Sequence, residues 1–201
     1  KAMDLAMSIL PPVSDKEIAK ALVEAEKRAF ENGLTTVDDA GLDKRIIQAI
    51  DSLHEIEELK IRVYAMISNT SKNLNYFLDK GIIENEKLTV RSVKAYLDGA
   101  LGSRGALLKN PYSDDKNNKG ITITSKEDLF ELADQLSSKG FQLNTHAIGD
   151  KANEIVLDVY NYILKDVKDP RWRVEHAQVV NQLDMQKFNS KIIPSVQPTH
   201  A

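Results

Sequence analysis

The feature that most constrains the fold is a regular alternation of helical stretches with short apolar runs along the chain. Six short apolar runs of five to seven residues are predicted to be strands. They span residues 34–38, 61–67, 91–97, 141–146, 172–178 and 192–196. The stretches between most of them carry apolar residues at three- and four-residue spacing, which is typical of amphipathic helices. This alternation predicts parallel strands joined by helical crossovers.

Two architectures fit the pattern, a doubly wound open sheet and a (β/α)8 TIM barrel. A complete barrel has eight strands and about 250 residues, whereas this chain has 201 residues and a helix before its first predicted strand. We therefore predict an α/β fold, an incomplete TIM barrel with about six of its eight strands. Because the chain starts at Lys1 without an initiator Met, we expect it to begin inside a longer protein. The open sheet edges would favour a homodimer.

Composition excludes several classes of protein. The 27 basic and 30 acidic residues give a net charge of −3, which lacks the basic footprint that nucleic-acid binding requires. The apolar stretches are far shorter than a membrane span. No signal-peptide pattern is present, so we expect a cytoplasmic protein, with export left open because the N-terminus is missing. The absence of cysteine excludes disulfides, thiolate ligands and a cysteine nucleophile.

Three of the four histidines lie at or just beyond the C-terminal ends of predicted strands: His146, His176 and His200. Active sites of α/β barrels form at that edge, because the βα loops gather there. His146 and His176 are 30 residues apart, one βα repeat, so we expect them on neighbouring strands at similar height. Either one alone would favour a structural histidine, whereas the pair favours a metal site, since imidazole is the commonest metal ligand. His54 is predicted to lie on a helix surface.

Lys94 lies in the middle of a predicted strand, where an unpaired ammonium group would be costly to bury. Its side chain could extend to the rim of the sheet or pair with Asp98, which lies on the same face. Alternatively, a depressed pKa would leave a neutral amine, which can react with carbon dioxide to give a carbamate. A carbamate is an anionic oxygen ligand that can bridge two metal ions.

A 27-residue irregular stretch, residues 98–124, follows this strand and is rich in Gly, Asn, Ser and Asp. Loops of that length are usually functional or disordered. Its glycines at 99, 102 and 105 match neither the dinucleotide-binding spacing nor a P-loop. The stretch is therefore not expected to be a phosphate-binding loop.

Five segments occur in order along almost the whole chain: TTVDDAG at 35–41, VKAYLDGALGSRGA at 93–106, LNTHAIGD at 143–150, RVEHAQ at 173–178 and SVQPTHA at 195–201. Together they resemble amidohydrolase family 3, which contains metal-dependent hydrolases such as N-substituted formamide deformylases. The resemblance implies a distorted barrel that holds one or two divalent metal ions, zinc in the first place, at its strand ends. The family's first-strand His-x-His pair, its eighth-strand Asp and its small β-domain have no match, so residues 1–201 are expected to form a partial barrel domain.

The resemblance also implies roles for individual residues. Lys94 matches the fourth-strand lysine that is expected to be carbamylated, and His146 and His176 match metal ligands of the fifth and sixth strands. These three are the expected metal-binding and catalytic residues. Arg104 is expected to clamp a substrate carbonyl or carboxylate, and His200 to polarise or orient the substrate.

The implied function is hydrolysis of carbon–nitrogen bonds in small amide-like molecules, other than peptide bonds, by metal-activated water. With part of the ligand set missing, the chain alone is expected to be inactive. The alternative is a metal-independent α/β protein that binds a small ligand, with the histidines serving as hydrogen-bonding groups.

Overall fold

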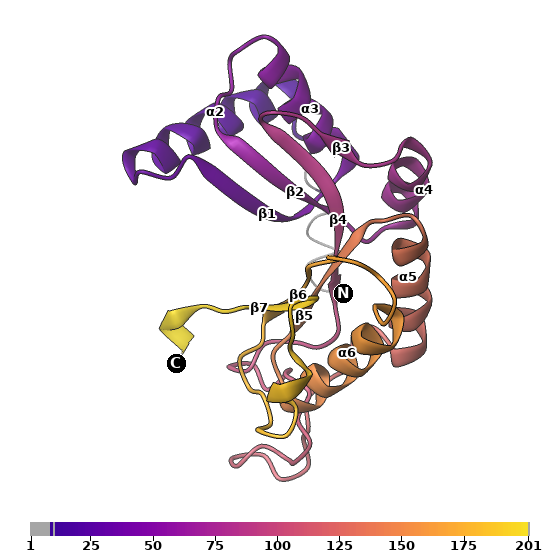
Figure 1. Ribbon diagram of the computed structural model, residues 1–201. Coiled ribbons are helices and arrows are strands. Elements are labelled where there is room, and N and C mark those ends of the chain that lie inside the picture. Colours follow the sequence, from indigo (N-terminus) through magenta and orange to yellow (C-terminus); the bar gives the residue numbers. More distant parts are fainter. Residues whose placement is uncertain (1–8, 10, 201) are drawn as a thin grey trace.

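The structure is a computed structural model that describes residue 9 and residues 11–200 (Figure 1). The strands of this described part form one sheet: β1 Thr36–Leu42, β2 Arg62–Ser68, β3 Ile83–Glu84, β4 Leu88–Tyr96, β5 Gln142–Ala147, β6 Trp172–His176 and β7 Ile192–Ser195. The strand order is β1-β2-β4-β5-β6-β7, and every neighbouring pair along this path is parallel. The short β3 pairs antiparallel with β4. The predicted parallel sheet is confirmed.

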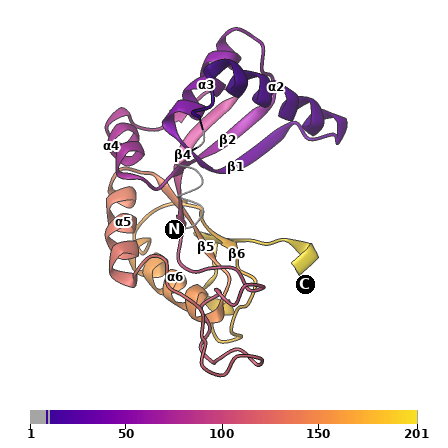
Figure 2. The same ribbon diagram turned by 180° about the vertical axis from the view of Figure 1, so that it is seen from behind.

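Helices separate the parallel strands: α2 Asp15–Glu31, α3 Lys44–Glu55, α4 Ser71–Lys80, α5 Lys126–Ser138 and α6 Asp150–Ile163, with the short 3₁₀ helices η1 Met185–Lys187 and η2 Pro198–His200. Figures 1 and 2 show the helices outside the curved sheet, whose concave side is open. A doubly wound sheet would carry helices on both faces, so this arrangement favours the barrel. None of the described helices is long and apolar enough to cross a membrane.

Contacts between distant strands show how strongly the sheet curves. Arg173 on β6 donates to the carboxylate of Asp38 on β1, although β2, β4 and β5 lie between those strands in the sheet. In the same way Tyr64 on β2 donates to Gln142 on β5. The contact between β1 and β6, which spans three intervening strands, is possible only across the concave side of a curled sheet. The described strands therefore form an incomplete TIM barrel, as predicted.

Sequence signals account for the ends of several helices. Ser14 and Glu17 form a capping box at the start of α2, and Ser125 accepts a hydrogen bond from the backbone N–H of Asp128 at the start of α5. Both satisfy backbone donors that a helix leaves unpaired at its N-terminus.

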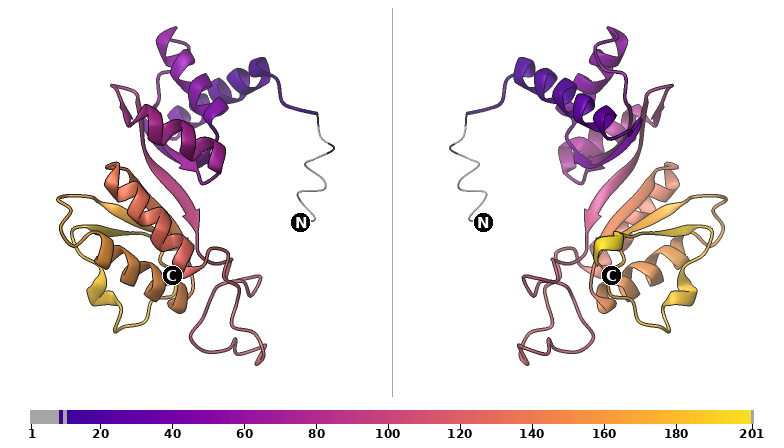
Figure 3. Two further views of the ribbon diagram at one scale, coloured as in Figure 1. Left: turned by 90° about the vertical axis from the view of Figure 1, so that its right-hand side faces the viewer. Right: turned by 90° about the vertical axis from the view of Figure 1, so that its left-hand side faces the viewer.

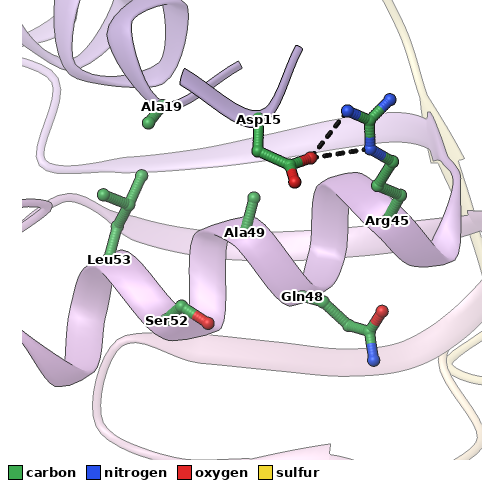
Figure 4. A pocket seen from close by; sticks show the side chains of 7 residues that line it. All are labelled: Asp15, Ala19, Arg45, Gln48, Ala49, Ser52 and Leu53. Atoms are coloured by element: carbon green, nitrogen blue, oxygen red, sulfur yellow. Dashed lines mark hydrogen bonds and ion pairs between the residues drawn. The ribbon is translucent and has the colours of Figure 1, made fainter. Parts of the chain in front are cut away.

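The α2 and α3 helices pack on each other outside the sheet. A cavity of about 360 Å³ lies between them. Figure 4 shows the side chains that line it, with Arg45 paired to Asp15. The shortest nitrogen–oxygen distance of this pair is 2.6 Å. The cavity is lined by Asp15, Ala19, Arg45, Gln48, Ala49, Ser52 and Leu53. No predicted site residue borders it, so it belongs to the outer helical layer.

Some sequence predictions need correction. The first strand is Thr36–Leu42 rather than 34–38, because pairing with β2 carries it through polar residues that the apolar pattern does not mark. The β3 strand is too short to give a periodic signal. The prediction that His54 lies on a surface is wrong: its side chain is buried, and its Nε2 lies 3.0 Å from the carbonyl oxygen of Ile61.

The long segment 98–124 carries no helix or extended strand in the structure, as predicted, and it extends past the tip of β4 (Figure 3). It is nevertheless docked on α6. The carbonyl oxygen of Leu107 accepts hydrogen bonds from the backbone N–H groups of Lys151 and Ala152, at 3.1 and 3.3 Å. These donors lie in the first turn of α6, where Gly149 at the N-cap has no side chain to offer. A β-carbon at Gly149 would lie 2.0 Å from the Leu107 oxygen, so the docking requires glycine there.

The substitution Gly149→Ala tests this docking. We expect it to lower the free energy of unfolding by about 1–3 kcal/mol, because the added methyl group must push the loop off the helix. Chemical denaturation of the chain measures the change. Gly102→Ala is the matched control, since nothing lies within 4 Å of a β-carbon there, and it should have little effect. Equal stabilities of the two variants would contradict the docking.

A second anchor of the same segment is ionic. The Nζ atom of Lys109 lies 2.6 Å from a carboxylate oxygen of Glu154 and 2.7 Å from one of Asp184. Burial alone would raise the pKa of Asp184, but hydrogen bonds from Lys109 and Lys187 outweigh it, so the pKa is lowered. A carboxyl group with a lowered folded-state pKa stabilises the fold above its unfolded-state pKa, and this contribution is lost as the pH falls.

We therefore expect Asp184→Asn to reduce the free energy of unfolding by about 1–3 kcal/mol at pH 7. The difference from the unsubstituted chain should shrink as the pH falls below about 4, the ordinary pKa of an aspartate. Urea denaturation across this pH range measures it, with Asp134→Asn, an exposed position on α5, as the control. A difference that does not depend on pH would show that the ion pairs are not its cause.

Candidate metal centre

His146 and His176 meet at the carboxyl edge of the sheet. The centres of their rings are 4.6 Å apart, with the ring planes at 72°. They lie on the neighbouring strands β5 and β6, as predicted. Their heights differ by one residue, because His176 is in register with Ala147, while His146 pairs with Glu175.

The backbone at the end of β6 explains how both rings reach the same place. Strand alternation puts Glu175 and His176 on opposite faces, and Glu175 accepts a hydrogen bond from Arg173, whose guanidinium reaches across the concave side to Asp38. His176 and Ala177 have φ angles of 74° and 41°. This left-handed conformation is costly for residues other than glycine and clusters at functional sites. It turns the chain so that the imidazole of His176 lies beside that of His146.

The imidazole of His146 is neutral at physiological pH. Burial lowers its pKa to about 4, helped by the nearby charges of Lys94 and His176. Its Nε2 atom is buried and has no hydrogen-bond partner among the described residues; the nearest carboxylate oxygen, on Asp98, is 3.5 Å away. Buried polar atoms without a partner are rare and call for an explanation. A neutral imidazole with a free buried nitrogen is the form that binds a metal ion.

Lys94 lies next to this pair on β4. Its side chain is 4% exposed, and its Nζ atom is 3.7 Å from the ring centre of Tyr96 and 3.2 Å from the carbonyl oxygen of Ala95. The ring of Tyr96 in turn lies 5.4 Å from that of His146. Burial lowers the pKa of Lys94 to about 8, although Glu175 opposes the shift. A substantial share of the amine is therefore neutral near physiological pH.

Asp98 has a role at this edge that its sequence context does not predict, beyond a possible pairing with Lys94. Its carboxylate is fully buried and accepts hydrogen bonds from the backbone N–H groups of Leu107, Ile148 and Gly149, at 2.9, 3.0 and 2.8 Å. Burial raises its pKa, and these hydrogen bonds oppose the rise. The signal available in the sequence was its place directly after a strand, before a glycine-rich segment.

The predicted substrate-binding residues lie apart from this cluster or outside the described atoms. The guanidinium of Arg104 lies in the exposed loop and pairs with Asp114, with nitrogen–oxygen distances of 2.8 and 3.2 Å. The backbone of His200 belongs to η2, and its side chain is outside the described part of the structure.

The described residues do not bring together a complete set of metal ligands. Among them, no three His, Asp or Glu side chains gather closely enough to hold a metal ion. Two imidazoles and a buried lysine remain as the ligand candidates. Beside the lysine is a cavity of about 300 Å³, lined by Gly41, Ser68, Asn69, Thr70, Lys94, Ala95, Tyr96, Ile123 and Thr124.

Residues 2–201 match the sequence model described as "Amidohydrolase family". The chain belongs to the amidohydrolase family. It is 33% identical to Protein LONG AFTER FAR-RED 3 of Arabidopsis thaliana and 30% identical to "Putative amidohydrolase YtcJ" of Bacillus subtilis, in each case over 98% of this chain. It spans 37% and 38% of the lengths of these two relatives.

A solved structure shares the architecture. This amidohydrolase chain superimposes on an uncharacterized metal-dependent hydrolase from Pyrococcus horikoshii with a TM-score of 0.81 and 29% identity. The match covers 92% of this chain and 38% of that one. The fold predicted from the strand pattern is therefore shared with that solved structure.

Replacing Asp98 tests whether its carboxylate holds the long loop and the turn after β5 in place at this edge of the sheet. In Asp98→Asn one carboxylate oxygen becomes an amide N–H₂ group that faces backbone donors, so we expect a loss of about 1–3 kcal/mol in unfolding free energy. Hydrogen exchange at the amides of Leu107, Ile148 and Gly149 should quicken. Asp114→Asn, in the exposed loop, is the control. Unchanged exchange at all three amides would refute the role.

Proposed function

We propose that the whole protein is a metal-dependent hydrolase that cleaves carbon–nitrogen bonds in small amide-like molecules. The observation that carries this proposal is the pair of touching imidazoles of His146 and His176, one with a free buried nitrogen, at the carboxyl edge of an amidohydrolase barrel. Family membership supports a hydrolase, and the solved relative is described as metal-dependent.

The residues present fit a divalent metal, which we propose to be zinc. Imidazole nitrogens are preferred zinc ligands, and His146 is held in its neutral form by burial. When bound, such a metal acts as a Lewis acid that polarises a carbonyl oxygen and lowers the pKa of water. His146 and His176 would hold it, and Lys94 would contribute a third ligand.

Lys94 is proposed to act as a carbamate. The neutral fraction of its amine can attack carbon dioxide, forming a carbon–nitrogen bond and releasing one proton. Burial favours this reaction because it lowers the pKa of the amine to about 8. The product carries a negative charge and two oxygen atoms, which suit a bridging position between two metal ions.

Arg104 and His200 remain proposed substrate-binding residues. Arg104 pairs with Asp114, so binding a substrate carbonyl or carboxylate would exchange one oxygen acceptor for another. The exchange is inexpensive because both side chains are exposed to solvent. The cavity beside Lys94 and Tyr96 would hold the substrate group next to the scissile bond.

Metal analysis beside amidase kinetics on variants of the whole protein tests the proposal. His146→Ala, His176→Ala and Lys94→Ala should each lower metal occupancy and reduce turnover by orders of magnitude, because each removes a ligand. A short carboxylic acid should partly restore Lys94→Ala by filling the bridging position. Arg104→Ala is the contrasting variant: metal content should stay unchanged, while KM rises or kcat/KM falls.

Two results would contradict this assignment. If His176→Ala kept full metal content and full activity, the assigned metal site would be wrong. The metal-independent ligand-binding alternative would then be favoured. The 201-residue chain alone should bind zinc weakly and hydrolyse nothing, because zinc sites need three or four protein ligands and its described residues supply two histidines and a lysine that is a ligand only as a carbamate. Tight stoichiometric binding by the chain alone would show that this ligand count is wrong.

A further inference from the structure

A hydrogen bond connects His176 to a residue that the proposed reaction does not use. The Nδ1 atom of His176 lies 2.7 Å from the side-chain carbonyl oxygen, Oε1, of Gln197. Gln197 follows β7, and Ser195 at the end of that strand is in register with Glu175 on β6. The segments that follow β6 and β7 therefore leave the sheet side by side, which brings the side chains of His176 and Gln197 together.

The chemistry of this contact determines where the proton of the imidazole lies. A carbonyl oxygen has lone pairs and no hydrogen, so it can only accept. The Nδ1 atom must then carry the proton. In a neutral imidazole only one ring nitrogen is protonated, so the Nε2 atom of His176 keeps a lone pair.

We propose that Gln197 is a positioning residue that holds His176 in the Nδ1–H tautomer and so reserves Nε2 for the metal. The inference rests on the proposed function, because it assumes that His176 is a ligand. Metal-binding histidines commonly donate their other ring N–H to an oxygen acceptor, which fixes both tautomer and ring orientation. Here Gln197 also fixes the orientation of the His176 ring, whose backbone has a left-handed conformation with φ of 74°.

The tautomer can be observed without metal or substrate. Long-range ¹H–¹⁵N spectra of the metal-stripped whole protein, labelled with ¹⁵N-histidine and recorded at pH 8, distinguish a protonated ring nitrogen from one with a lone pair. His176→Ala identifies the signals. We expect His176 to show a protonated Nδ1 and an unprotonated Nε2. In Gln197→Met, which keeps the length of the side chain and removes the acceptor, both tautomers should appear.

Two further variants test whether the tautomer depends on residue 197 being a hydrogen-bond acceptor or a donor. Gln197→Glu keeps an acceptor and should retain the Nδ1–H tautomer. Gln197→Lys offers only donors, so it should reverse the tautomer and place the proton on Nε2. A general loss of packing would not produce opposite results in these two variants. An unchanged Nδ1–H signal in both Gln197→Met and Gln197→Lys would overturn the proposal.

Metal affinity, measured by competition with a chelator for zinc, provides the second readout. We expect Gln197→Met to bind zinc about 10–100-fold more weakly, and Gln197→Glu to bind at least as tightly as the unsubstituted protein. If the tautomer mixes in Gln197→Met but zinc affinity is unchanged, Gln197 does not act on the metal and the inference fails. If His176→Ala also keeps full zinc affinity, the proposed function itself fails; loss of zinc in that variant alone leaves the proposed function intact.

Discussion

The carboxyl edge of the sheet depends on one buried carboxylate. Asp98 accepts three backbone hydrogen bonds from two other segments, the long loop at Leu107 and the turn after β5 at Ile148 and Gly149. A buried carboxylate without partners would be costly, and the three donors offset part of that cost. The loop, the start of α6 and the strand that carries His146 are thereby held in one arrangement.

The same burial that makes this edge rigid also sets its chemistry. Burial lowers the pKa of His146 to about 4 and that of Lys94 to about 8, because a charged group loses its hydration when it is buried. Neutral imidazole and neutral amine are the forms that can donate lone pairs. Burial therefore favours the forms of His146 and Lys94 that can bind a metal ion. In His176, the proposed hydrogen bond from Nδ1 to Gln197 leaves Nε2 free.

Much of the fold could be predicted because it depends on local patterns. Strand and helix periodicity predicted the parallel strands, and the capping residue Ser14 marked the start of α2. The errors have a common origin in contacts that lie outside the element concerned. His54 lies on a helix with charged neighbours, yet its ring is buried because it reaches the carbonyl oxygen of Ile61. The polar strand β1 exists because β2 pairs with it.

For the candidate site, the sequence alone determined the family and the identity of the three ligand candidates, since ordered motifs and strand ends can be read along the chain. Only the tertiary structure decided how those residues meet. Alternation would separate His176 from the face shared by Arg173 and Glu175, and a left-handed strand end brings its ring to His146. The partners of Asp98 and Gln197 lie in segments distant along the chain. Periodicity describes a chain one element at a time, whereas these contacts exist only after the sheet has curled and placed its strand ends together.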